Sequence, residues 1–275
     1  MDAAAARLLE ADEPSPVLMH PPGLSPAAWA QGGATGGSPF LLAADHAGKR
    51  LPRRLGDLGI SAAELSRHIG WDIGIWGTTT VLAELLGTLA IGQGYSRLVI
   101  DCNRHPDWAS AVPEISESTA IPGNAGLAPE ARAARVAEIH APYHAALAGA
   151  VRARLAAGLP LLFVAMHSFT PVYKGVARPW HAGVLHDVDD ARSRPLADAM
   201  LELLRAEPGL VVGDNEPYVL AATSDHSVPT HAQGNGVRYL ELEIRQDLIA
   251  GEAGQRVWAA RLARLIPAAW ARCAG

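Results

Sequence analysis

Two histidines, His46 and His167, each stand near the end of a short apolar run. Such runs predict buried strands, so both side chains are expected where a strand gives way to a loop. A zinc site in a hydrolase takes about three protein ligands and leaves one position open for water. A single histidine at a strand end more often only hydrogen-bonds locally. Two at equivalent ends of two strands favour a metal site.

A carboxylate is needed as the third ligand, and Asp72 in the segment HIGWDIG (68–74) is the first choice. His68 lies four residues earlier and would share a face with Asp72 on a continuous helix, so that one could ligate and the other support it. Asp45 is the second choice. It adjoins His46, but neighbouring residues on a strand point to opposite faces.

The segment Asp101–Arg104 carries side chains suited to a substrate carboxylate. Arg104 can fork a carboxylate, and Asn103 beside it can add an amide hydrogen bond. Arg97 could stabilise a developing oxyanion if the chain returns it to the metal. Asp101, in an apolar run, is expected to be a structural acceptor for an arginine or for backbone amides.

Glu241 and Glu243 alternate along YLELEIRQD and therefore face the same side of a strand. A carboxylate beside the attacking water can act as general base and then as general acid to the leaving amine. Glu243 is the candidate. A structural pair between Glu243 and Arg245 is the alternative, since a glutamate in an apolar strand must be paired.

Apolar runs and helical periodicity alternate along the chain after about residue 37. Strands are predicted at 40–48, 97–103, 160–171, 182–187, 209–214 and 237–245, and helices at 60–87, 129–158, 193–206 and 254–272. The first helix is expected to break near 70–74, with Ser61 as its N-cap and Glu64 as capping-box partner. This alternation predicts an α/β fold with a largely parallel sheet covered on both faces. Ligands bind at the carboxyl ends of such strands.

Composition excludes several classes of protein. A net charge of -5 gives no basic surface for nucleic acid, and no run of about 18 apolar residues predicts a membrane span. The two cysteines, Cys102 and Cys273, form no CxxC pair. The acidic start of the chain does not read as a secretory signal, so a cytoplasmic protein is expected. Residues 1–37, rich in glycine and proline, are interpreted as an N-terminal extension, and residues 38–275 as a single catalytic domain.

Beyond these residues, the chain resembles the N-formylglutamate amidohydrolase family over about residues 38–270. The matching segments are DHAG (45–48), HIGWDIG (68–74), SRLVIDCNR (96–104), IPGN (121–124), PYH (142–144), HSFTPVYKG (167–175), RPWH (178–181), GDNEPY (213–218) and LEIRQDLI (242–249). Their order and number make chance agreement improbable.

The resemblance implies a three-layer α/β/α sandwich around a mixed, mostly parallel sheet, as in zinc carboxypeptidases and aspartoacylases. It implies one Zn²⁺ per chain, held by His46, His167 and a carboxylate. The family pattern assigns Glu243 as the base, Arg97 as the oxyanion arginine, and Asn103 with Arg104 as the carboxylate receptor. The expected reaction is hydrolysis of the amide of a small N-acyl amino acid such as N-formylglutamate.

One departure from the family pattern concerns the first motif. The family usually has PHSG, whereas this chain has Asp45-His46-Ala47-Gly48, and Lys49 stands where a carboxypeptidase-type HxxE would have its glutamate. The carboxylate ligand must therefore come from elsewhere, which favours Asp72. Further candidates for the substrate pocket, each equally compatible with a structural role, are Ser168, His144, Tyr218, Tyr143, Tyr173, His181, Glu216 and His231.

Three other interpretations remain open at this point. A serine or cysteine hydrolase is disfavoured because no GxSxG segment occurs and Cys102 lies in an apolar run. A non-catalytic binding protein would keep the fold without turnover. The same fold could also act on another N-acyl amino acid or a peptide-like amide, because a family fixes chemistry better than substrate.

Overall fold

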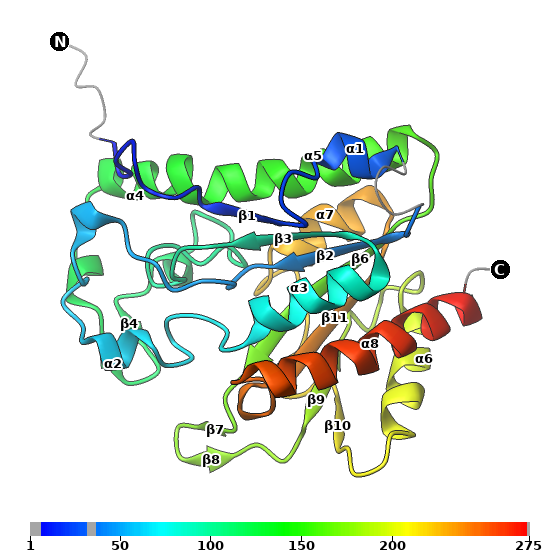
Figure 1. Cartoon of the computed structure of the whole chain (residues 1–275). Helices are drawn as coiled ribbons and strands as arrows, with labels where there is room; N and C mark the ends of the chain where they lie inside the picture. Colours follow the sequence, from blue (N-terminus) through cyan, green and yellow to red (C-terminus); the bar gives the residue numbers. More distant parts are fainter. Residues whose placement is uncertain (1–6, 32–36, 274–275) are drawn as a thin grey trace.

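The computed structural model describes residues 7–31 and 37–273 and contains a seven-stranded mixed sheet (Figure 1). The strand order is β1-β3-β2-β6-β11-β9-β10. Their bounds are β1 (Val17–His20), β2 (Phe40–Ala44), β3 (Leu89–Gln93), β6 (Leu162–Phe169), β9 (Ala182–Leu185), β10 (Val212–Asp214) and β11 (Arg238–Arg245). The pairs β3–β2, β2–β6, β6–β11 and β9–β10 are parallel, whereas β1–β3 and β11–β9 are antiparallel.

Helices cover both faces of this sheet (Figure 1). The helices on one face are α1 (Pro26–Ala30), α4 (Pro129–Arg135), α5 (Ala141–Ala156) and α7 (Ser227–His231), and those on the other are α3 (Ile75–Leu86), α6 (Arg194–Arg205) and α8 (Glu252–Cys273). A short α2 (Ala62–Leu65) lies beside the site. The predicted α/β fold with helices on both faces of a mostly parallel sheet is confirmed.

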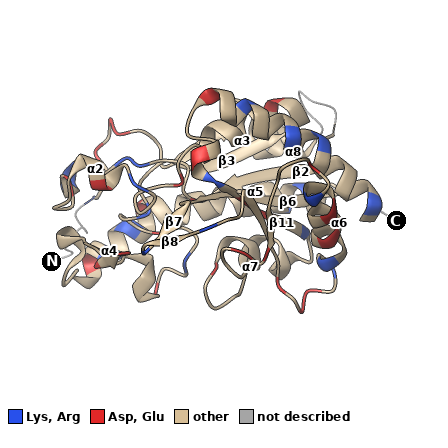
Figure 2. Cartoon of the chain, turned by 90° about the horizontal axis from the view of Figure 1, so that it is seen from below, with Lys and Arg blue, Asp and Glu red and all other residues tan. Residues whose placement is uncertain are grey.

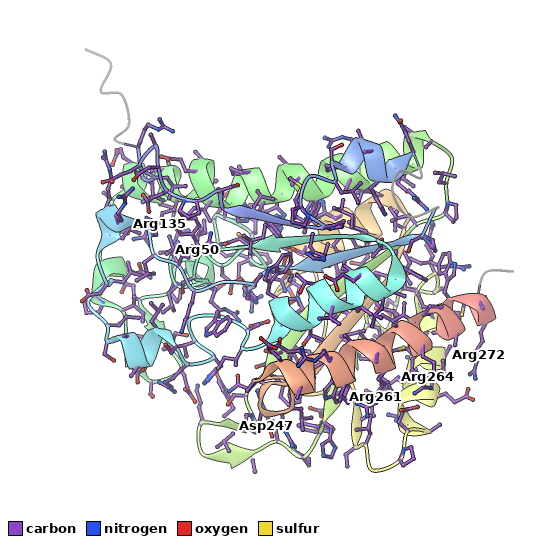
Figure 3. The ribbon with its side chains drawn as sticks, in the orientation of Figure 1. Arg50, Arg135, Asp247, Arg261, Arg264 and Arg272 are labelled. Carbon is purple, nitrogen blue, oxygen red and sulfur yellow. The ribbon has the colours of Figure 1, made fainter. Side chains whose placement is uncertain are left out.

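The central strands are hydrophobic on both faces because helices exclude water from each. Every residue of β2 and β6 is buried, and the buried apolar side chains form one cluster on each side of the sheet. The helix α8 buries a stripe that includes Trp258, Leu262 and Leu265. Its outer face carries Arg261 and Arg264, labelled in Figure 3, which both pair with Glu207.

The predicted strand at 97–103 is wrong. Leu98, Val99 and Ile100 are buried, but their backbone groups are satisfied outside any sheet. Asn124 Nδ2 donates to Leu98 O (2.9 Å) and Arg135 Nη1 donates to Val99 O (2.8 Å). The strand at this place in the chain is β3, eight residues earlier. It carries Gly92, which weakens the strand pattern and leaves room for the Trp76 ring.

The helix predicted at 60–87 breaks as expected, into α2 and α3. Ser61 Oγ accepts from Glu64 N at 3.2 Å, which confirms the N-cap. The Glu64 side chain does not complete a capping box, because it bonds Arg67 and Thr119 instead.

The helix predicted at 129–158 is continuous but not uniform. Between α4 and α5 lies a π-helical turn, η4 (Val136–His140), in which Ala141 N donates to Val136 O. Arg135, just before this turn and labelled in Figure 3, points its guanidinium into the protein and is fully buried.

Part of the predicted N-terminal extension packs on the sheet. β1 adds an antiparallel edge strand next to β3, and Trp29 of α1 is buried with Leu8 and Leu24. The apolar positions in this segment are too few and too widely spaced to reveal that packing in the sequence.

Two short hairpins lie at the end of the sheet that carries the site. They consist of β4 (Ile115–Ser116) with β5 (Thr119–Ala120), and β7 (Val172–Tyr173) with β8 (Val176–Ala177). Lys174 N donates to Glu117 Oε1 at 3.1 Å and so joins the two tips. Charged residues of both signs are spread over the outer helices and loops, and neither sign occupies one side (Figure 2). In the described residues, no helix is long and apolar enough to cross a membrane.

Candidate active site

His46, Asp72 and His167 converge at the carboxyl ends of β2 and β6. Asp72 Oδ2 lies 3.4 Å from His46 Nδ1 and 3.2 Å from His167 Nδ1, and all three side chains are buried. Since β2 and β6 are neighbouring parallel strands, the two histidines reach the same edge of the sheet. The sequence predicted this group, and the structure brings it together.

Asp72 reaches this edge from a turn that precedes α3. Asp72 N donates to His46 O (3.0 Å), and Ser168 N donates to Asp72 Oδ2 (3.2 Å). The turn ends at Gly74, whose φ is +79° and whose added Cβ would lie 1.9 Å from Ile249 O. Only glycine fits there, which explains the residue type two positions after the carboxylate.

Each histidine also faces a second carboxylate with its outer ring nitrogen. His46 Nε2 donates to Asp101 Oδ1 at 2.7 Å, and His167 Nε2 lies 3.4 Å from Asp45 Oδ2. Asp45 Oδ1 in turn accepts from Tyr143 Oη (2.7 Å) and Ser227 Oγ (2.6 Å). Asp45, the second choice as a ligand in the sequence, therefore lies behind His167 and outside the converging group.

The electrostatics of the group are those of a buried acceptor for positive charge. Burial opposes ionisation of Asp72, but the His46 and His167 imidazoles outweigh it and hold the pKa of Asp72 below its usual range. Burial and Arg97 oppose protonation of His46, but the carboxylates of Asp101 and Asp72 outweigh them and raise its pKa. Burial likewise opposes protonation of His167, but Asp45 and Asp72 raise its pKa well above 6.5.

A zinc ion fits these donors. Ligands about 2.0–2.1 Å from a tetrahedral ion lie about 3.4 Å from one another, close to the two separations seen around Asp72 Oδ2. Ligating histidines usually donate their other ring nitrogen to a carboxylate, and here each faces one. Two imidazoles and one carboxylate also match the donor types of open zinc sites in hydrolases.

Glu243 stands directly beside this group. It is the register partner of His167 in the β11–β6 pair, so the two side chains emerge on the same face of adjacent strands. It is buried, and its Oε2 has no hydrogen-bond partner among the described residues. Burial raises the pKa of Glu243 to about 8. Arg245 pairs with Asp247 instead, which removes the structural alternative for Glu243.

A cavity of about 490 Å³ opens onto the group. Of the first-choice metal ligands and the catalytic and substrate-pocket candidates, those that do not line it are His144, Tyr143, His181, Glu216 and His231. Arg97 lies between two carboxylates, with Nη2 2.6 Å from Asp101 Oδ2 and Nη1 3.5 Å from Asp72 Oδ1. The expectation that Asp101 accepts from an arginine and from a backbone amide is confirmed, since Asn103 N also donates to it (2.9 Å). Glu241 lines the same cavity, and burial raises its pKa well above the usual range.

The carboxylate-receptor pair is partly engaged within the protein. Asn103 Oδ1 accepts from His226 N (2.9 Å), and its Nδ2 donates to Asp225 Oδ1 (3.0 Å). Arg104 Nη1 donates to Asn103 O (2.8 Å) and lies 3.7 Å from Asp225 Oδ1. Arg104 thus has guanidinium N–H groups left for a ligand, whereas both polar atoms of the Asn103 side-chain amide are hydrogen-bonded within the protein.

Ser168 and Tyr218 both line the cavity, but they differ in how their hydroxyl groups are engaged within the protein. The Ser168 hydroxyl donates to Ile73 O (3.0 Å) and so anchors the Asp72 turn. Tyr218 is 42% exposed and accepts from Arg178 Nη1 at 2.9 Å. His144 lies behind the cavity, where its Nε2 donates to Cys102 O (2.9 Å).

Some lining residues had no role in the sequence analysis. Glu117 lines the cavity, and its Oε2 lies 3.5 Å from His68 Nε2. His68 therefore faces Glu117 and not Asp72, because α2 ends at Leu65 and residues 68–72 are not helical, so the two side chains share no helix face. No local pattern marks Glu117, which lies in the turn between β4 and β5.

The fold and this group define a hydrolase of the α/β class. The sequence profile of N-formylglutamate amidohydrolase matches residues 38–250. The chain belongs to the N-formylglutamate amidohydrolase family, and it is a hydrolase that acts on an amide C–N bond.

Two solved structures match nearly the whole chain. Gene product Atu2144 from Agrobacterium tumefaciens is 36% identical, with 98% of this chain and 100% of that chain covered and a TM-score of 0.87. N-formylglutamate amidohydrolase from Ralstonia eutropha JMP134 is 19% identical, with coverage of 93% and 97% and a TM-score of 0.63. An aspartoacylase family protein from Mesorhizobium loti MAFF303099 is 15% identical over 82% of this chain and 57% of that chain, with a TM-score of 0.31. A search of curated proteins finds no match.

Proposed function

We propose that this chain is a zinc-dependent amidohydrolase that removes the formyl group from an N-formyl amino acid such as N-formylglutamate. The observation that carries the proposal is the convergence of His46, Asp72 and His167 beside the unpartnered carboxyl of Glu243, on one cavity. The substrate is named from the family, and the cytoplasmic location stays a prediction.

The three converging side chains would hold the zinc ion. When bound, the ion supplies Lewis-acid polarisation of the substrate carbonyl and lowers the pKa of water at the open position. Asp101 and Asp45 keep the two imidazoles oriented, because each carboxylate faces the outer nitrogen of one ring.

Glu243 moves the proton. Its Oε2 accepts a proton from the attacking water and then passes it to the leaving amine nitrogen. This role needs a group that keeps a proton between the two transfers. Burial, which raises the pKa of Glu243 to about 8, suits that task. Arg97 places a fixed positive charge next to Asp72, where it stabilises negative charge on the carbonyl oxygen. Arg104 offers guanidinium donors to the substrate carboxylate.

The test is hydrolysis of N-formyl-L-glutamate, measured as the release of formate and glutamate. N-acetyl-L-glutamate and N-succinyl-L-glutamate are assayed in parallel. Chelation should abolish turnover and zinc should restore it. Glu243→Gln is the matched control, because it should bind zinc normally yet lose roughly 10²–10⁴-fold in rate. Turnover that survives complete metal removal would refute zinc dependence. Preference for another acyl group would refute the formyl substrate.

A further inference from the structure

Behind the active site lies a cluster of five imidazoles, from His105, His140, His144, His226 and His231. These are five of the 11 histidines in the chain, and neighbouring ring centroids lie 4.2–5.5 Å apart. His140 is the last residue of the π-helical turn, His144 lies in α5, and His226 is the residue before α7.

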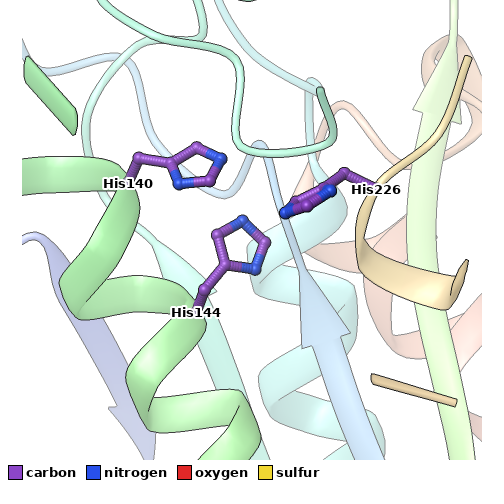
Figure 4. Close-up of side chains that lie close together, drawn as sticks. All are labelled: His140, His144 and His226. Atoms are coloured by element: carbon purple, nitrogen blue, oxygen red, sulfur yellow. The ribbon is translucent and has the colours of Figure 1, made fainter. Parts of the chain in front are cut away.

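Three of the rings aim at a common point. Figure 4 shows His140 and His144 side by side on the helix and His226 facing them from the opposite loop, each with one ring nitrogen toward the space between them. One nitrogen from each ring lies within 4.8 Å of the other two. Residues four apart on a helix share a face, so this pair and a third imidazole form the donor pattern of a metal site.

These imidazoles are in the protonation state that binds metal. Burial and the neighbouring His140 lower the pKa of His144 well below 6.5 and that of His226 to about 4, and burial also lowers the pKa of His140. Neutral imidazole is a common ligand for first-row divalent ions.

The backbone beside the rings offers two carbonyl oxygens that could also bind a metal ion. His140 Nε2 donates to Arg104 O at 3.1 Å, and His144 Nε2 donates to Cys102 O at 2.9 Å. A metal ion bound to Nε2 of His140 and Nε2 of His144 would replace both of these hydrogen bonds. Each ring would then carry its proton on Nδ1. For His144 that proton has an acceptor in place, because His231 Nε2 lies 2.8 Å from His144 Nδ1. A partner on the outer nitrogen is the usual setting of a ligating histidine.

We propose that His140, His144 and His226 bind a second divalent cation of the zinc type, separate from the ion at His46. The site holds together two segments that bound the substrate cavity, since His226 N donates to Asn103 Oδ1 (2.9 Å) and Asn103 lines that cavity. His144 is therefore a ligand of this second site and not a substrate contact.

The test counts zinc ions. Metal-free protein is titrated with Zn²⁺, and bound zinc is measured after gel filtration for wild type and for His226→Gln, His231→Gln, His167→Ala and the remote control His20→Gln. Wild type and His20→Gln should hold two equivalents. His226→Gln should lose the second and keep the first, and His167→Ala the reverse. His231→Gln should keep both but weaken the second roughly 10–100-fold.

Other results would overturn the proposal. A single equivalent in wild type would mean that the five rings are a neutral network closed on the Arg104 and Cys102 carbonyls. Two equivalents in His226→Gln would place the second zinc elsewhere. His226 is only half buried, so this variant should fold, which its thermal melting without zinc verifies. Because the readout is bound metal, it is independent of which substrate the enzyme hydrolyses.

Discussion

Replacing Asp101 by asparagine tests how the zinc site is held. Asp101 Oδ1 accepts from His46 Nε2 (2.7 Å) and Asn103 N (2.9 Å), and its Oδ2 accepts from Arg97 Nη2 (2.6 Å) and Nε (3.1 Å). Asparagine keeps one acceptor oxygen, so its NH₂ group must face a donor on one side or the other. Either His46 or Arg97 loses its partner.

The magnitude follows from these contacts. Loss of a carboxylate behind a ligating histidine typically costs 10–100-fold in metal affinity, which is about 1.4–2.8 kcal/mol. Because the substitution removes two of the four acceptor contacts and also the negative charge that strengthens the other two, we expect about 100-fold. The matched control is Asp45→Asn. Asp45 Oδ2 is farther from His167 Nε2 (3.4 Å), and its Oδ1 can keep Tyr143 and Ser227, so the expected loss is about tenfold or less.

The assay is competition for zinc with a chromophoric chelator, with both variants in the His226→Gln background so that only the site at His46 reports. Circular dichroism verifies the fold. A zinc affinity of Asp101→Asn within about twofold of the parent, or a larger loss in Asp45→Asn, would refute the assignment of these carboxylates.

Three further predictions concern the substrate, the proton and the fold. Arg104→Lys should weaken binding of a carboxylate substrate, and Arg104→Ala should weaken it more, by roughly 2–5 kcal/mol of binding free energy. If replacing the substrate carboxylate by an amide weakened binding equally in wild type and in Arg104→Ala, Arg104 would not bind the carboxylate. Zinc affinity at the His46 site should keep rising above pH 6.5, because the raised pKa values of His46 and His167 keep a competing proton bound there; a chelator titration that is flat from about pH 6.5 to 8 would contradict this. Tyr143→Phe removes a 2.7 Å hydrogen bond to buried Asp45 and should lower the free energy of unfolding by about 1.5–3 kcal/mol in urea melts; an unchanged midpoint would show that Ser227 alone suffices.

The sequence predicted most of the elements that carry the site because those elements are locally encoded. The strand that holds His167 is a nearly continuous apolar run, the strand that holds Glu243 alternates glutamates with apolar residues, and the break before Asp72 is marked by glycines. Side chains at the ends of neighbouring parallel strands must meet, so their types alone indicated the metal group.

The errors arose where burial is satisfied by distant partners. The segment at 97–103 is as apolar as a strand, but Asn124 and Arg135 take its carbonyl groups, and no local pattern encodes that. β3 was missed because Gly92 interrupts its apolar run. The role of Asp45 behind His167 likewise depends on Tyr143 and Ser227, which lie 98 and 182 residues away along the chain.

The π-helical turn at Val136–His140 makes the length of this helix a constraint. A π turn holds one residue more than an α turn, so a regular α-helix with the same number of residues would rotate everything before this turn by about 100° relative to α5. Arg135 would leave Val99 O, and Glu138 would leave Leu8 N and Leu9 N. Helices that cover a sheet usually accept shifts at their ends, but here the extra residue fixes the phase of one half against the other. Related chains that keep the buried arginine but have one residue fewer between it and the histidines should therefore have a regular α-helix here.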